Sequence, residues 1–373
     1  MFYLYLSIFH LFISFLEFFK KKKLLFFLSI IVFVCISGLR YKTGVDWIGY
    51  TEYYNKSYLE MIQRNDVDFG YILLMALFKN LKLNYYFMQF FISLFVSFCL
   101  YLFYIKNSNC PLFCIYIYIN LYYLRYNMGL ERQVIALALC LIAYEFNKNK
   151  KNVLTLFFFL ISVLFHFSSI IFFLIFYLYK IIKIKLRTQI ILILLFIIFN
   201  VFQIDIIDII LKVLLFFSEK LQLSFIVNKI VYYTGNEYYS NDVGLTKTFI
   251  AQFIVILIVF IFRKPKNGNE EKIYFFTTIY ILLTFLSSTF YVLDRLQSYF
   301  GVFSIVLICY IFELFKRNRV IFLCFGIYFL CPMLNFTFHK ETRHYMRYVP
   351  YYNVFYKVED INRWKAEIGL IGK

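Results

Sequence analysis

Residues 85–105 read YYFMQFFISLFVSFCLYLFYI and contain no charged side chain. A bilayer is crossed by a helix of about 20 apolar residues. We therefore predict that this stretch is a transmembrane helix. Eleven further apolar stretches flank it on both sides and are predicted to span as well, namely 2–19, 24–39, 110–124, 129–146, 153–166, 167–180, 189–204, 248–262, 273–289, 296–315 and 320–336.

One apolar stretch, 69–79, is too short to cross a bilayer and is predicted to be re-entrant or interfacial. The whole chain, 1–373, then forms a single polytopic all-α membrane domain with about 12 transmembrane helices. The segments 153–166 and 167–180 are each short, so 153–180 could instead be one long tilted helix. That alternative would reverse the orientation of everything that follows it.

The composition agrees with a membrane protein. Of 373 residues, 62% are hydrophobic and only 16% are charged, against about 25% charged in soluble domains. This excludes a soluble enzyme, a secreted disulfide scaffold and a disordered chain. The eight cysteines fall mostly in apolar stretches and no Cys/His cluster stands out, so we predict neither a metal nor a cofactor. The 51 Phe and 35 Tyr residues fit a general compositional bias, and we do not interpret them as sugar-binding residues.

The net charge of +18 is assigned to loops on the cytoplasmic side rather than to nucleic-acid binding. The first apolar stretch precedes four lysines, which predicts a retained span with its N-terminus outside. The connections then placed inside are Lys20–Lys23, the segment around Lys106, 147–152, 181–188, 263–272 and 316–319. The long outer segments are the loops 40–84 and 205–247 and the C-terminal tail 337–373.

Charged residues at the borders of the spans are functional candidates, because a charge at membrane depth is costly. With His166, which lies in an otherwise apolar run, and Tyr299 they form the candidate set: Arg40, Asp46, Arg125, Glu131, Arg132, His166, Asp294, Arg295 and Tyr299. In the predicted orientation the polar members lie at the outer ends of their helices. We therefore predict one polar site that faces outward.

Structural roles remain open for several of these residues. Arg40 would also serve as an interfacial anchor, and Asp46 could brace its loop. Arg125 and Arg132 are seven residues apart and would share a face if their helix extends back, where either could pair with Glu131 or Asp294. His166 could form a helix–helix hydrogen bond together with Ser169.

The residue types point to chemistry on a phosphorylated ligand. Arginine offers two parallel donors to phosphate oxygens, which suits a lipid diphosphate as ligand and leaving group. A nearby His or carboxylate could take a proton from an acceptor hydroxyl. Such a set fits metal-independent glycosyl transfer from a polyprenyl-diphosphate sugar, although a transporter of an anionic substrate would also use Arg and His.

Several motifs, in order along the chain, resemble those of the EpsG-like family of polysaccharide polymerases, which are relatives of the Wzy O-antigen and capsule polymerases. They are Leu39-Arg40-Tyr41 with Gly44, Asp46 and Tyr50; Asp68-Phe69-Gly70-Tyr71; Glu131-Arg132-Gln133 with Ala136; Phe165-His166-Phe167-Ser168-Ser169; Asp294-Arg295 with Tyr299-Phe300; and Tyr348-Val349-Pro350-Tyr351. The resemblance covers nearly the whole chain.

The resemblance implies a glycosyltransferase in the bacterial inner (cytoplasmic) membrane, with its active site facing the periplasm or exterior. It would transfer a growing glycan from undecaprenyl diphosphate to the next lipid-linked repeat unit. A chain-length regulator and a flippase are further candidate partners. His166, Asp46 and Asp294 are the candidate catalytic residues, and the remaining candidates would bind substrate. An O-antigen ligase and a flippase or exporter of lipid-linked oligosaccharide remain alternatives, although the absence of an internal repeat disfavours a transporter.

Overall fold

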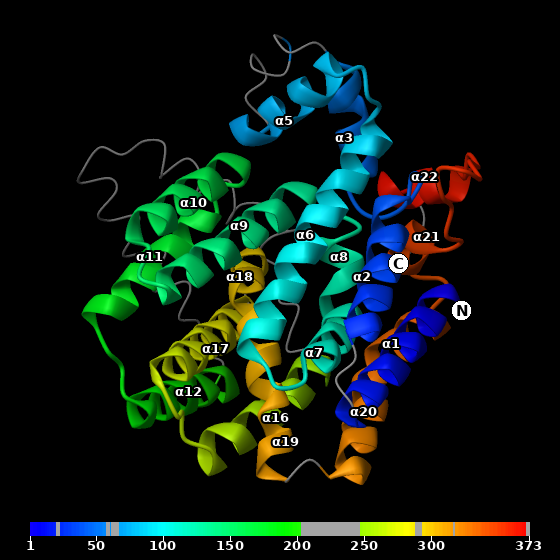
Figure 1. Cartoon of the computed structure of the whole chain (residues 1–373). Coiled ribbons are helices and arrows are strands. Elements are labelled where there is room, and N and C mark those ends of the chain that lie inside the picture. Colours follow the sequence, from blue (N-terminus) through cyan, green and yellow to red (C-terminus); the bar gives the residue numbers. More distant parts are fainter. Residues whose placement is uncertain are drawn as a thin grey trace. The chain divides into compact units, whose positions relative to one another are not determined.

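The structure is a computed structural model that describes residues 1–19, 23–56, 60, 67–202, 247–287, 293–315 and 318–370 (Figure 1). Helices dominate the described residues, and the β-type pairing found there consists of two isolated bridges, Arg40 with Asn353 and Asn353 with Tyr356. The chain divides into two compact units. Unit 1 contains Met1–Ile170 and Phe315–Lys373, and unit 2 contains Ile171–Leu314.

Unit 1 carries the N-terminal helices and the C-terminal tail. Its helices are α1 (Phe2–Phe19), α2 (Lys23–Gly38), α3 (Trp47–Asn55), α5 (Phe69–Asn80), α6 (Tyr85–Asn107), α7 (Pro111–Tyr118), the π-helix η1 (Ile119–Tyr123), α8 (Leu124–Tyr126), α9 (Glu131–Lys148), α10 (Asn152–Phe165), α20 (Arg319–Phe338), α21 (Arg343–Tyr348) and α22 (Ile361–Glu367). Helix α6 packs between α2 and α9, α10 packs on α9, and α1 packs on α7 and α20.

Local sequence explains where several of these helices begin. The side chain of Asn84 accepts a hydrogen bond from the backbone N–H of Phe87 and caps α6, and Asn318 caps α20 in the same way through Val320. Helix α7 starts at Pro111, a position where the missing N–H of proline costs nothing. Each cap precedes an uninterrupted apolar run, so the helices start where the sequence predicts them.

The long helices of unit 1 run between two ends of the unit. At one end, Arg40 after α2 contacts Glu131 at the start of α9. At the other end, Lys106 near the end of α6 lies 3.8 Å from Glu145 near the end of α9. We call these the Arg40 end and the Lys106 end. The N-terminus lies at the Arg40 end, because the hydroxyl of Tyr3 donates to the Tyr348 carbonyl in the tail.

Unit 2 consists of most of α11 (Ser169–Ile181), α12 (Leu186–Val201), α16 (Lys247–Phe262), α17 (Gly268–Ser287), α18 (Asp294–Cys309) and α19 (Ile311–Leu314). Helix α17 packs on α12 and α18, and α16 packs on α18 and α19. Aromatic side chains form much of this core, with the rings of Phe172, Phe276 and Phe303 within about 6 Å of one another.

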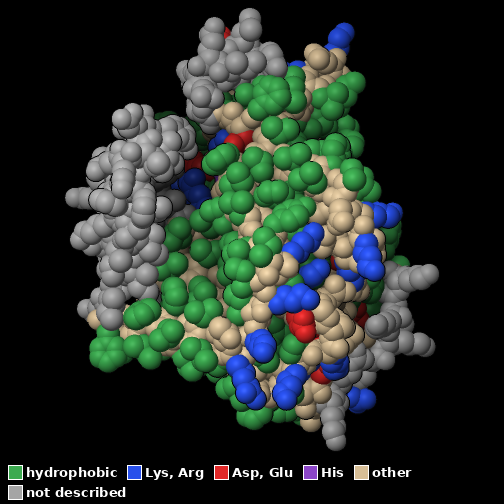
Figure 2. Space-filling view, turned by 90° about the vertical axis from the view of Figure 1, so that its left-hand side faces the viewer, with side chains coloured by type: hydrophobic (Ala, Val, Ile, Leu, Met, Phe, Trp, Pro, Cys, Tyr) green, Lys and Arg blue, Asp and Glu red, His purple; other side chains and the backbone are tan. Residues whose placement is uncertain are grey.

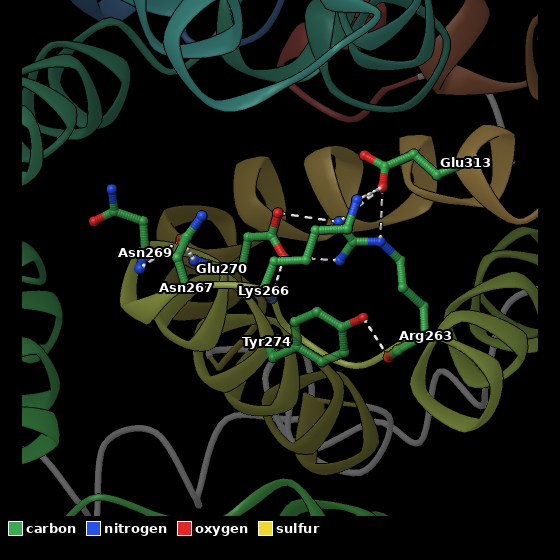
Figure 3. A network of polar contacts seen from close by, with 7 residues as sticks. All are labelled: Arg263, Lys266, Asn267, Asn269, Glu270, Tyr274 and Glu313. Atoms are coloured by element: carbon green, nitrogen blue, oxygen red, sulfur yellow. Dashed lines mark hydrogen bonds and ion pairs between the residues drawn. The ribbon is translucent and has the colours of Figure 1, made fainter.

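A buried arginine ties three segments of unit 2 together (Figure 3). Arg263, only 5% exposed, forms paired hydrogen bonds of 3.0 Å with both carboxylate oxygens of Glu270. Its guanidinium also contacts Glu313 at 3.0 Å and lies over the ring of Tyr310. Lys266 adds a second contact to Glu313 at 2.6 Å. The network joins the end of α16 to α17 and α19.

We expect Arg263→Met to destabilise the protein by about 3 kcal/mol, because removing one partner leaves buried charges uncompensated. The measurement is the thermal unfolding midpoint of the purified protein in detergent. The matched control is Lys264→Ala, since Lys264 is the exposed neighbour of Arg263. Equal midpoints for the two variants would show that the network does not stabilise unit 2.

The exposed surface of the helices is largely apolar. On α10, the exposed hydrophobic side chains are Val153, Leu154, Leu156, Phe157, Leu160 and Leu164. Figure 2 shows hydrophobic side chains over much of one face, with Lys and Arg side chains gathered in one part of it. Large exposed apolar surfaces are unusual in soluble monomers, and here they fit contact with lipid. The chain is a membrane-integral protein.

The predicted positions of the spans agree closely with the helices. Each of the twelve apolar stretches contains a helix, and α5 covers the short stretch 69–79. Three described helices are long and apolar enough to cross a membrane, Tyr85–Asn107, Asp294–Leu314 and Arg319–Phe338, whereas the other apolar helices are shorter. The all-helical prediction is therefore confirmed for the described residues, but the count of about 12 spans is not.

Two further predictions concern the connections. Residues 153–180 form two helices, α10 and α11, that are interrupted at His166, rather than one continuous helix. The loop 40–84, predicted to be outside, contains α3 and α5, and the tail 337–373 contains α21 and α22. The loop 205–247 lies, except for its last residue, outside the described residues.

Candidate functional site

A buried ion pair lies at the Arg40 end of unit 1. Arg40 is 3% exposed and donates from Nη2 to Oε1 of Glu131 at 2.6 Å, while Glu131 is 1% exposed. The hydroxyls of Tyr85 and Tyr71 donate to the two carboxylate oxygens at 2.8 and 2.7 Å. The segment after α2 and the helices α5 and α6 thus each place a donor on the Glu131 carboxylate of α9. The desolvated ion pair is fully hydrogen-bonded on the Glu131 side.

Arg40, two residues after the end of α2, is held in place by α6 and by its own segment. The amide of Gln89 in α6 donates to the carbonyls of Gly38 and Arg40 at 3.0 and 2.9 Å. The Arg40 guanidinium also donates to the carbonyl of Ser37. These contacts fix the chain where α2 ends, so the position of Arg40 is determined by its own segment and by α6.

A second polar cluster centres on Asp68, the residue just before α5. Its Oδ2 accepts a hydrogen bond from Arg132 Nη1 at 2.9 Å and lies 3.4 Å from His166 Nδ1. The carboxylate also accepts from the backbone N–H of Phe167, and Arg132 is hydrogen-bonded to Tyr50. The Asp68 and His166 side chains are each 19% exposed, so this cluster reaches the surface while the Arg40–Glu131 pair does not.

The negative charge of Asp68 determines which ring nitrogen of a neutral His166 carries the proton. Burial would raise the pKa of Asp68, but the hydrogen bond from His166 and the positive charge of Arg132 outweigh it and hold the pKa below its ordinary value. Asp68 is therefore ionised near neutral pH and only accepts hydrogen bonds. A neutral His166 must then carry its proton on Nδ1, which leaves Nε2 with a free lone pair.

The contact between α5 and α10 sets the distance across the Asp68 cluster. A Cβ atom added to Gly70 would lie 2.9 Å from the carbonyl oxygen and 3.0 Å from the carbonyl carbon of Leu164. Both atoms belong to backbone, so one helix would have to move. Only glycine allows α5 to approach α10 this closely, two residues from Asp68 and two from His166.

We expect Gly70→Ala to lower any activity that depends on the spacing of Asp68 and His166 by about tenfold or more, because small displacements of reacting groups are costly. The measurement is chain formation from lipid-linked repeat units, the reaction that the sequence resemblance implies. No polar group is removed by this change. The matched control is Gly49→Ala in α3, where an added Cβ would meet only the Tyr53 ring at 3.7 Å. Activity of the Gly70 variant equal to that of the Gly49 variant would show that the spacing of Asp68 and His166 does not matter.

The C-terminal tail covers the loop that follows Arg40. Backbone hydrogen bonds join Tyr41 to Tyr352 and Gly44 to Arg347, each at 2.9 Å. Gly44 has a φ of +109°, and a Cβ there would overlap the Met128 carbonyl oxygen, which requires glycine. The tail, the loop that follows Arg40 and the turn before α9 therefore pack as one layer.

Asp46 and Arg125 belong to this layer rather than to the Asp68 cluster. Asp46 is exposed at the start of α3, and its backbone N–H donates to Glu367 Oε1 at 2.7 Å. Arg125 lies in α8, and its charge acts on His344 and Tyr348 of the tail. A turn at 127–130 separates α8 from α9. The idea that Arg125 and Arg132 share one helix face is therefore wrong.

The remaining candidates lie in unit 2. Asp294 opens α18, is 7% exposed and accepts a hydrogen bond from the amide of Gln297. Arg295 is exposed, whereas the side chain of Tyr299 is fully buried. These residues belong to unit 2 and His166 belongs to unit 1. Their convergence with His166 on one site stays a prediction.

Sequence reasoning missed several contributors to the site as candidates, among them Asp68, Tyr71, Tyr85 and Gln89. Asp68 could have been found, because it is the acidic residue directly before the apolar stretch 69–79. Tyr85 and Gln89 occupy the first turns of the span 85–105, a position that polar side chains in a membrane helix often share with a site. Their partners, however, are far away in the sequence.

Comparison with known proteins gave one match. No curated protein and no solved structure matched the chain. The sequence model that describes the EpsG family matches residues 23–353, a range that includes Arg40, Asp68, Glu131, Arg132, His166 and Asp294. The match extends over nearly the whole chain and over both units. The protein therefore belongs to the EpsG family.

Proposed function

We propose that this protein polymerises a surface polysaccharide, such as an O-antigen, capsule or exopolysaccharide. It would move the growing glycan from undecaprenyl diphosphate onto the next lipid-linked repeat unit. The EpsG family is associated with polysaccharide polymerase activity, and membership in it is the observation that carries the reaction class. The Asp68 cluster supplies groups suited to that reaction at a partly exposed position.

In the proposed step, His166 acts as the general base. Nε2 takes the proton from a hydroxyl of the acceptor sugar, and that oxygen attacks the anomeric carbon of the donor glycan. The bond between the anomeric carbon and the diphosphate oxygen breaks, and undecaprenyl diphosphate leaves with the electron pair. The proton on His166 then passes to solvent. Asp68 holds the imidazole in the required tautomer and stabilises its charged form.

Arginines with accessible guanidinium groups would bind the diphosphate. Arg132 borders the Asp68 cluster with its side chain 26% exposed, and Arg295 is exposed in unit 2. Arg125 is partly exposed in the layer beneath the tail. Arg40 and Glu131 are too deeply buried to be first contacts, so we assign them to holding α2, α5 and α9 in place around the site.

The proposed location is the bacterial inner membrane, with the Arg40 end facing the periplasm or exterior. In unit 1 this end collects the N-terminus, both helices of the loop 40–84 and the tail. The Lys106 end carries Lys106, Lys148, Lys150 and Lys151. An excess of Lys and Arg in short loops marks the cytoplasmic side, which supports this orientation.

A deletion strain tests the proposal. Loss of the polymerase should leave single repeat units on the cell surface and remove long chains, as seen on a gel of extracted polysaccharide. Complementation with the wild-type chain should restore the long chains. A strain in which no repeat at all reaches its final acceptor would indicate a ligase or flippase and would overturn the proposed reaction.

A further inference from the structure

A cavity of about 640 Å³ opens at the Arg40 end of unit 1. Its walls come from α3, the start of α6 and the tail around α22, so three segments distant in the sequence enclose it. The volume lies within the range of about 300–1,000 Å³ that is typical of small-ligand sites. The Asp68 cluster contributes no residue to its lining, so the cavity is a separate feature.

Aromatic side chains form a large part of the lining. Both tryptophans of the chain, Trp47 and Trp364, line the cavity together with Tyr54, Tyr85 and Tyr86. The general abundance of Phe and Tyr cannot explain this, because Trp occurs only twice in 373 residues. Flat aromatic faces pack against the apolar C–H faces of sugar rings while their polar atoms stay free for hydrogen bonds.

The polar lining suits an uncharged ligand. Its carboxylates are Glu52, Glu359 and Asp360, and two amides, Asn55 and Asn84, add both donors and acceptors. The two cationic residues of the lining are already engaged. Lys42 pairs with Glu359 at 2.6 Å, and Arg363 donates to Thr43 at 2.9 Å and to backbone carbonyls. A diphosphate or an anionic lipid headgroup would therefore meet repulsion here.

Tyr85 connects the cavity to the buried Arg40–Glu131 pair that supports the proposed reaction site. It lines the cavity, and its hydroxyl donates to Glu131, the partner of Arg40. We propose that this cavity is a carbohydrate subsite that binds sugar units of the glycan chain. The proposal rests on the proposed function for the identity of the glycan, but binding itself requires no polymerisation.

Intrinsic fluorescence provides a direct test, because both tryptophans of the chain line the cavity. The probe is a repeat-unit oligosaccharide, released by partial hydrolysis from the surface polysaccharide of the cell that encodes this chain. Added to the purified full-length protein in detergent, it should change the emission in a saturable way. Inorganic pyrophosphate at the same concentration should cause no change.

Variants separate a sugar site from a nonspecific response. Trp364 is 46% exposed in α22, so Trp364→Ala should fold and should weaken oligosaccharide binding by about tenfold, read through Trp47. Trp364→Phe keeps an aromatic face and should restore most of the affinity. The matched control is Phe355→Ala, because Phe355 lies in the same tail, is 84% exposed and does not line the cavity.

The outcomes distinguish this inference from the proposed function. If the enzyme polymerises but its tryptophan fluorescence does not change when the oligosaccharide is added, the carbohydrate subsite is overturned and the polymerase proposal stays intact. Emission that responds to pyrophosphate as strongly as to the oligosaccharide would also overturn it. Saturable oligosaccharide binding that depends on Trp364, in a protein without polymerase activity, would support the subsite and contradict the reaction.

Discussion

Replacement of His166 by Gln should reduce polymerisation by about 10²–10⁴-fold, because general-base assistance is typically of that size. Gln is the informative substitution, since its amide can still donate to Asp68 but cannot accept a proton near neutral pH. His166→Ala should lose activity to the same extent. The measurement is chain formation by the purified enzyme supplied with lipid-linked repeat units.

The matched control for this prediction is His339→Gln. His339 is one of the four histidines of the chain and is exposed at the end of α20, where its imidazole Nδ1 lies 2.8 Å from the backbone carbonyl oxygen of Asn335. That variant should be fully active. If His166→Gln polymerises as well as His339→Gln, the role of His166 is structural, and Asp46 or Asp294 becomes the better candidate for the base.

The positions of the helices could be predicted from the sequence because they depend on local information. An apolar run of the right length, bounded by Lys, Asn or Pro, determines a helix with little help from distant residues. The helix boundaries of α6 and α20 illustrate this, since their caps Asn84 and Asn318 lie next to the helices they start. The interruption at His166 was also predicted, in a run without Pro or Gly.

The pairing of polar groups could not be predicted, because it depends on residues far apart in the chain. Arg40 and Glu131 are 91 positions apart, and Asp68 and His166 are 98 apart. Sequence analysis identified Arg40, Glu131, Arg132 and His166 singly and assigned all of them to one site. The structure separates them into a buried pair and a partly exposed cluster, and this difference in burial is the basis on which we propose a supporting role for the pair and a chemical role for the cluster.

The cavity was beyond sequence reasoning for a different reason. Its lining combines α3, the start of α6 and residues 358–364 of the tail, and the tail has no apolar periodicity that would place it. Tyr and Phe are frequent throughout the chain, so the aromatic residues that line the cavity do not stand out in the sequence. Only the fold shows that both tryptophans meet at one place.

Replacement of Asp68 by Asn tests whether the negative charge of Asp68 assists His166. Arg132 Nη1 and His166 Nδ1 both contact the same oxygen, Oδ2, so an Asn oxygen in that position would still accept from both, and the substitution removes the charge alone. The imidazolium that forms when His166 takes the proton would then lose the carboxylate that stabilises it. We expect kcat to fall by about 10²–10⁴-fold with little change in KM, and exposed Glu341→Gln serves as the control.

The pH dependence of stability distinguishes this charge effect from general disruption of the fold. The pKa of Asp68 is lowered in the folded protein, so its carboxylate stabilises the fold above the ordinary pKa of about 3.9, and that stabilisation is lost as the pH falls through the folded pKa. The wild type should therefore unfold at a higher temperature than Asp68→Asn at neutral pH, and the difference should shrink below about pH 4. A difference that stays constant with pH, combined with unchanged kcat, would show that the negative charge of Asp68 neither assists His166 nor stabilises the fold.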